Sequence, residues 1–170
     1  MGSYVKGALL AAGLAVLTAC GSDSAGTGKP CTLIGTREGI GLDIAAPYAA
    51  KVGEATMKIC WNGACREPKV QLMDSTTAVP EPCTGDAPDD VCGASASPDG
   101  GRTGFADVTG LPTSPVQVTL TLRDASGERL LAKRLDVTPH ATYPNGKDCG
   151  KGAPQAKLAV TGDGRVTVRS

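Results

Sequence analysis

The stretch that decides the fold is Val116-Gln-Val-Thr-Leu-Thr-Leu-Arg123, in which apolar and polar residues alternate throughout. Successive side chains of a β-strand point to opposite faces, so this period of two places Val116, Val118, Leu120 and Leu122 together on one face. The other face carries glutamine, threonine and arginine. The stretch therefore predicts an antiparallel strand with one face on a core and the other in water.

The same alternation recurs elsewhere in the chain and predicts further strands. Ile40, Leu42 and Ile44 alternate with glycine and aspartate, and residues 156–160 and 166–168 repeat the pattern. Glycine-rich turns separate these runs, and the one helix-like segment, residues 45–50, is too short for more than a helical turn. Strands at this spacing predict an all-β fold, namely an antiparallel β-sandwich of about 7–8 strands with an immunoglobulin-like architecture.

The segment Cys60-Trp-Asn-Gly-Ala-Cys65 predicts a tight hairpin closed by a disulfide. Asn-Gly is the preferred pair for a type I′ turn, because both central positions need a positive φ. This register sets the two cysteines opposite each other, at a Cα separation of about 4.5 Å that a disulfide can bridge. It also sets Lys58 opposite Glu67 and places Trp61 on an apolar face, where we expect it to pack in the core rather than to bind a ligand.

The N-terminus predicts export. Lys6 precedes an apolar run of 11 residues, Gly7–Leu17. As a helix this run would span about 16 Å, roughly half of the hydrocarbon core, which suits a signal peptide but not a transmembrane span. The run ends in Leu17-Thr-Ala-Cys20, which resembles the lipobox of bacterial lipoprotein precursors.

The lipobox resemblance implies cleavage after residue 19 and a diacylglyceryl thioether on Cys20. Two acyl chains suffice for stable anchoring, here to the extracytoplasmic face of the cell membrane. The alternative is an ordinary secretory signal with an incidental cysteine. We therefore expect a signal peptide over residues 1–19, a flexible tether over residues 20–30 and a single β-sandwich domain over residues 31–170.

The six remaining cysteines predict three disulfides, because the compartment outside the membrane is oxidising. We expect the pairs Cys60–Cys65, Cys83–Cys92 and, by elimination, Cys31–Cys149. The alternative is a zinc site, which would want C-x-x-C pairs and several histidines. The chain has no C-x-x-C motif and one histidine.

Residues 73–102 interrupt the strand pattern with four prolines, six acidic residues, one basic residue and no apolar period. We expect a long acidic loop, which the pair Cys83–Cys92 would staple, and loops of this length are often functional. Its acidic surface is a candidate for contact with a partner. Asp86, Asp89 and Asp90 suggest a calcium site as an alternative, although they lack the ordered spacing of a calcium-binding loop.

The composition of the chain argues against several classes of function. Removal of residues 1–19 leaves 16 lysines and arginines against 17 acidic residues, a balance that argues against nucleic acid as a partner. His140, the one histidine, accompanies no serine or cysteine nucleophile motif. We therefore expect a monomeric, non-catalytic binding or interaction module without cofactor or metal, whose partner is an envelope protein or a small ligand. The alternatives are an enzyme or protease-inhibitor-like module acting through loop 73–102, and a calcium- or metal-binding envelope protein.

The order of motifs also resembles β-sandwich lipoproteins of high-GC Gram-positive bacteria, which are anchored by a lipobox. The resemblance implies location and fold rather than an activity. The residues that carry it are Cys31-Thr-Leu-Ile-Gly35, Cys60-Trp-Asn-Gly-Ala-Cys65, Gly104-Phe-Ala-Asp-Val-Thr-Gly-Leu-Pro112, and Thr142-Tyr-Pro-Asn-Gly146 with Cys149-Gly150.

Overall fold

The computed structural model describes residues 31–85, 87 and 89–169. Contacts divide the chain into two units, of which Leu33–Ser170 carries the fold described below. The predicted signal peptide, the lipid attachment at Cys20, the tether and Asp86 all lie outside the described residues. Within the described residues, no helix is both long enough and apolar enough to cross a membrane.

The described part of the chain is built from strands, which confirms the predicted all-β class. Two short 3-10 helices, η1 (Tyr48–Lys51) and η2 (Lys147–Cys149), accompany them. The strands are β1 (Gly39–Ile44), β2 (Glu54–Trp61), β3 (Ala64–Arg66), β4 (Lys69–Glu81), β5 (Gly93–Asp107), β6 (Val116–Arg123), β7 (Arg129–Val137), β8 (His140–Ala141), β9 (Pro154–Val160) and β10 (Val166–Arg169).

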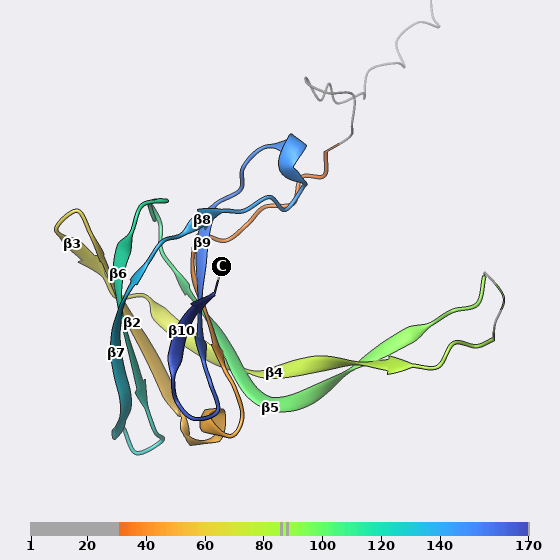
Figure 1. The fold of residues 1–170 in the computed structure, drawn as a ribbon, viewed down its shortest axis with the longest axis horizontal. Coiled ribbons are helices and arrows are strands. Elements are labelled where there is room, and N and C mark those ends of the chain that lie inside the picture. Colours follow the sequence, from red (N-terminus) through yellow and green to blue (C-terminus); the bar gives the residue numbers. More distant parts are fainter. Residues whose placement is uncertain (1–30, 86, 88, 170) are drawn as a thin grey trace, which may run out of the picture. The chain divides into compact units, whose positions relative to one another are not determined.

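The strands form one curled sheet in the order β10-β9-β1-β5-β4-β2-β6-β7, with β3 paired to β2 and β8 paired to β9 (Figure 1). Strand β4 joins the two halves, because its first residues pair with β2 and the following ones with β5. The prediction of purely antiparallel pairing is wrong at one place, since β1 and β9 run parallel. Apolar alternation reports which face of a strand is buried and not the direction of its neighbour.

The core lies between the two halves of the curled sheet. Leu120 is fully buried, as are its neighbours on the apolar face of β6 that the sequence singled out. Full burial of one such side chain contributes about 1.5–3 kcal/mol to folding. The other fully buried core side chains come from β1, β2, β7 and β9: Ile40, Leu42, Ile44, Met57, Ile59, Val137, Leu158 and Val160.

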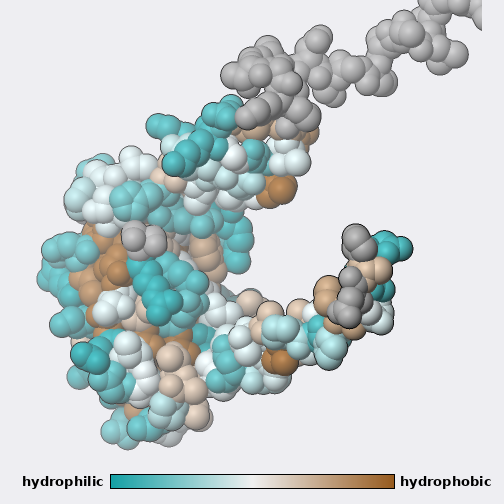
Figure 2. All heavy atoms as spheres, turned by 45° about the vertical axis from the view of Figure 1, so that its right-hand side comes forward, coloured by the Kyte–Doolittle hydropathy of each residue, from teal (hydrophilic) through white to brown (hydrophobic). Residues whose placement is uncertain are grey.

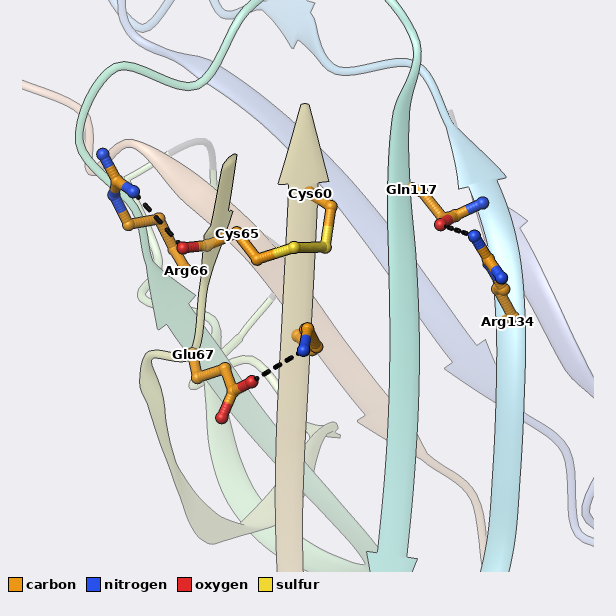
Figure 3. The surroundings of a disulfide bond; sticks show 7 residues. Cys60, Cys65, Arg66, Glu67, Gln117 and Arg134 are labelled. Carbon is orange, nitrogen blue, oxygen red and sulfur yellow. Dashed lines mark hydrogen bonds and ion pairs between the residues drawn. A yellow bond between two sulfur atoms is a disulfide. The ribbon is translucent and has the colours of Figure 1, made fainter. Parts of the chain in front are cut away.

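The β2–β3 hairpin forms as predicted. Cys60 pairs with Cys65 across the strands and is disulfide-bonded to it (Figure 3). The turn residue Asn62 has a φ of 48°. Trp61 is partly buried against the core, and the guanidinium carbon of Arg66 lies 5.7 Å from its ring centroid. A cation–π contact therefore explains why an arginine occupies the apolar face of this hairpin.

The structure corrects the predicted loop over residues 73–102. Most of this segment belongs to β4 and β5, which continue past the core as a two-stranded ribbon (Figure 1). We call residues 74–102 the arm; its described side chains are mostly exposed on both faces. A strand without a buried face needs no apolar period, and for this reason the sequence carried no strand signal there.

The prolines of the arm fit its strands. Pro98 pairs with Thr76 and Pro80 pairs with Ala94. Hydrogen-bonded and non-hydrogen-bonded residue pairs alternate along an antiparallel ladder. These two pairs lie four positions apart and are therefore of the same kind. A proline lacks an N–H, so both sit where that group would point outward, on the edges of the ribbon.

All six described cysteines are disulfide-bonded, which confirms the disulfide-bonded character of the fold. Cys83 and Cys92 are bonded to each other and close the tip of the arm. Cys31 and Cys149 are disulfide-bonded as well.

Candidate ligand-binding groove

A groove of about 740 Å³ lies on the outer face of β4, β5, β1 and β9, which is the face turned away from the core. It reaches the base of the arm at one end of these strands, where Met73 and Thr103 line it. At the other end it reaches residues 141–153, which we call the lobe, where Ala141 and Thr142 line it. Figure 2 shows the hollow between them. Along the strands the groove therefore extends from the base of the arm to the lobe, and it is continuous across the strands.

Strand pairing arranges the floor of the groove in rows that run across the strands. The central row is Gln71, Phe105, Gly41, Lys157 and Arg169, each directly paired with the next. The row beside the arm contains Met73, Thr103 and Asp43. The row beside the lobe contains Asp107, Gly39, Gln155 and His140.

One glycine on β1 lowers the middle of the floor, and a second lets two strands pack closely beside it. A Cβ atom at Gly41 would meet the Lys157 side chain at 3.5 Å, an ordinary contact, so this glycine leaves usable space. At Gly39 a Cβ atom would lie 2.7 Å from the Phe105 ring and 2.0 Å from the Ala106 carbonyl oxygen. Only glycine fits at that position, because the ring and the neighbouring strand occupy the space.

Arg37 fixes the lobe side of the groove. Its Nε and one terminal nitrogen donate to the two carboxylate oxygens of Asp107, at 2.9 and 2.5 Å, while its guanidinium carbon lies 4.3 Å from the Phe105 ring centroid. Its backbone carbonyl accepts a hydrogen bond from the Gln155 amide at 2.6 Å. The hydrogen bond from Arg37 lowers the pKa of Asp107, so this carboxylate is ionised and neutralised by its partner.

A second ion pair fixes the arm side of the groove. The Lys157 ammonium lies 2.7 Å from an Asp43 carboxylate oxygen, and the Thr103 hydroxyl donates to the other oxygen at 3.2 Å. Both acidic residues that line the groove are thus paired with cations. Lys69 and Arg169 also line the groove, and no ion pair is seen for either among the described residues. The lining of the groove therefore carries a net charge of about +2 at neutral pH.

Hydrogen bonds hold the base of the arm. The Ser75 hydroxyl and the Gly101 amide both donate to Asp99, and the first of these bonds is the main cause of the lowered pKa of Asp99. Arg102 donates to the carbonyl of Val52 at 2.8 Å and so ties the arm to the segment that follows η1. These hydrogen bonds therefore stabilise the direction in which the arm extends from the rest of the sheet.

The residues singled out from the sequence are dispersed. His140 lies in β8 and lines the groove, whereas Trp61 packs against the core and the Cys83–Cys92 disulfide lies at the arm tip. Asp90 accepts hydrogen bonds from the Thr84 hydroxyl and the Ala87 amide. No group of three or more histidine, cysteine or acidic side chains suited to a metal ion occurs among the described residues.

Sequence reasoning missed the groove itself. Its lining comes from separate segments, among them that of Arg37 and Gly41, that of Lys69 and that of Arg169, and only strand pairing brings them together. The available signal was the polar, glycine-containing outer face of the alternating strands, which by itself indicates only contact with water. In comparisons with known proteins, no family model, no curated protein and no solved structure matches this chain.

Proposed function

We propose that this protein is a non-catalytic binding module of the cell envelope that takes its ligand in the groove and is held at the membrane by lipid on Cys20. The observation that carries the proposal is the groove, whose floor is built entirely on paired strands. Sites on strands are more rigid than sites on loops, so the binding surface is formed before the ligand arrives.

The charges of the groove support binding rather than acid–base catalysis. Asp43 and Asp107 are each tied to a cation, and the pKa of Asp107 lies below its ordinary value. A general acid or base works best with a pKa near the pH of the reaction, and burial or a like charge is what raises a carboxyl to that range. The ion pairs instead give these carboxylates the role of fixing the groove's shape.

The lipobox and the disulfides support a place outside the cytoplasm. Disulfides persist in oxidising compartments, and the apolar run before Cys20 has the length of an export signal. We also propose an immunoglobulin-like architecture, because the two halves of the curled sheet enclose one core.

Photo-crosslinking in the native envelope tests the proposed binding surface. A photoreactive phenylalanine analogue would replace Gln71 in the groove, or Gln117 on the outer face of β6 as a matched control. We expect ultraviolet light to produce a discrete adduct from position 71 and none from position 117. No adduct from position 71, or the same adduct from both positions, would refute the proposal.

Membrane fractionation tests the anchor independently. The Cys20→Ala variant should appear in the medium or remain as an uncleaved precursor, because a single thioether is the proposed attachment. Normal processing together with full retention on the membrane would contradict the assignment of Cys20.

A further inference from the structure

We infer that the groove binds a segment of polypeptide that lies across the strands and carries two acidic side chains about six residues apart. This inference rests on the proposed function and adds the chemical class of the ligand. It follows from the direction of the groove, the positions of its charges and the character of its middle.

The direction of the ligand follows from what lies at the two ends of the strands. Met73 lies in the row beside the arm and is followed directly by the arm's first residue, while His140 lies in the row beside the lobe and is followed by the lobe's first residue. A ligand that ran along the strands would meet the base of the arm at one end and the lobe at the other (Figure 2). A ligand that runs along the rows, from β4 to β10, follows the continuous direction of the groove.

The charges lie at the two ends of this path. Lys69 is on β4 and Arg169 is on β10, and both side chains are exposed. Four strand spacings of about 4.8 Å, with a small offset along the strand, separate their Cα atoms by about 20 Å. At about 3.3 Å per residue, an extended chain covers that distance in six residues.

The β10 end has a reason of its own to bind an anion. Arg169 pairs directly with Lys157, which sets two positive side chains opposite each other on one face. Like charges in this arrangement disfavour folding, and Asp43 compensates Lys157 alone. A ligand carboxylate beside Arg169 would neutralise the positive charge that Asp43 leaves uncompensated.

The middle of the path is suited to an uncharged stretch of peptide. Asp43 and Asp107 are neutralised by their partners, so the middle has little net charge and offers no counter-charge to the central part of a uniformly charged polyanion. Beside the middle, at the β4 end, Gln71 offers an amide that both donates and accepts, which matches a peptide backbone. Phe105 on β5 and Met73 on β4 offer apolar surface next to this stretch, and Met73 is 62% exposed.

A display selection tests the inference on the full-length protein in detergent. One library holds nonapeptides with glutamate at positions two and eight and random uncharged residues elsewhere, and the matched library holds glutamine at both positions. Exposed ion pairs each contribute up to about 1 kcal/mol, so we expect roughly fivefold enrichment for each glutamate and more for both together. The enrichment should decrease in high salt.

Two single substitutions show which basic residue of the groove recognises which glutamate of the peptide. Lys69→Gln should remove the preference for one glutamate and Arg169→Gln the preference for the other, while Lys133→Gln on β7 should change neither. All three side chains are exposed, so the thermal unfolding temperature should stay the same and report that the variants fold. Equal enrichment of the two libraries, or no effect of either substitution, would overturn the inference.

Three further outcomes separate the ligand class from the proposed function. Inorganic polyphosphate that displaces the selected peptides fully at equal charge concentration would show a general anion surface, against the inference. An adduct from position 71 with no glutamate preference in the selection would leave the groove as the binding site and overturn only the ligand class. No adduct from position 71 would refute the proposed function itself.

Discussion

The substitution Gly39→Ala should destabilise the protein far more than Gly41→Ala, two positions further along the same face of β1. Gly39 has a φ of 151°, which side chains of L-residues rarely adopt, and a Cβ atom there would lie 2.0 Å from the Ala106 carbonyl oxygen. Real Cβ atoms do not approach other atoms closer than 3.0 Å. The backbones of β1 and β5 would therefore have to separate by about 1 Å, against close packing.

The magnitude follows from two contributions. An unfavourable positive φ costs about 1–2 kcal/mol, and overpacking between strands costs about 1–3 kcal/mol. Gly39→Ala should thus lower the free energy of unfolding by about 2–5 kcal/mol, which corresponds to a decrease in Tm of about 5–15 °C for a domain of this size. At Gly41 the new methyl group would make an ordinary contact with Lys157, and alanine is favoured over glycine in a strand by about 0.5–1 kcal/mol.

Thermal unfolding followed by circular dichroism, together with urea unfolding, measures both variants with the disulfides intact. We expect Gly39→Ala to unfold at a clearly lower temperature than the unsubstituted protein, and Gly41→Ala to unfold at the same or a slightly higher temperature. The Gly41 methyl group should nevertheless weaken ligand binding, because it fills the floor of the groove. Equal Tm values for the two variants would refute the proposed packing of β1 against β5.

Three further predictions concern the core, the ion pair and the arm. Leu120→Ala should cost about 2–5 kcal/mol in chemical unfolding, whereas Thr119→Ala on the outer face should cost less than about 1 kcal/mol, and similar values would contradict the assignment of the two faces. The hydrogen bond from Arg37 lowers the pKa of Asp107 below its ordinary value of 3.8. The ion pair therefore stabilises the fold at pH values above 3.8, and this contribution is lost as the pH falls through the lowered pKa. Arg37→Gln should raise the carboxyl pKa in an NMR titration, and an unchanged pKa would exclude the pair. Replacing residues 78–96 by an Asn-Gly turn, which the pair Thr77–Ser97 would close, should leave Tm nearly unchanged, because that part of the arm adds little buried surface. A cooperative loss of structure would show that the arm supports the core.

The parts of the fold that were predicted correctly depend on neighbours in the chain. The Cys60–Cys65 disulfide and the 3.3 Å ion pair between Lys58 and Glu67 follow from one tight turn, whose residues set the register by themselves. The strand at β6 follows from the alternation of its own residues, because one of its faces is fully buried.

The arm was missed because its strands have no buried face. Alternation of apolar residues is a signature of burial, and the residues from Thr76 to Glu81 are exposed on both sides. Prolines, which in a central strand would block pairing, are tolerated at the edges of an isolated ribbon. A loop and an exposed ribbon therefore have the same composition, and only the pairing of β4 with β5 distinguishes them.

The sequence by itself determined the all-β class, the faces of the core strands and the hairpin disulfide, since these depend on side-chain period and turn chemistry over a few residues. The tertiary structure alone decided the parallel pairing of β1 with β9, the arm and the groove. The physical reason is that the row from Gln71 to Arg169 crosses five strands. Its members become neighbours only when long-range pairing sets the register, and nothing in any one segment encodes that row.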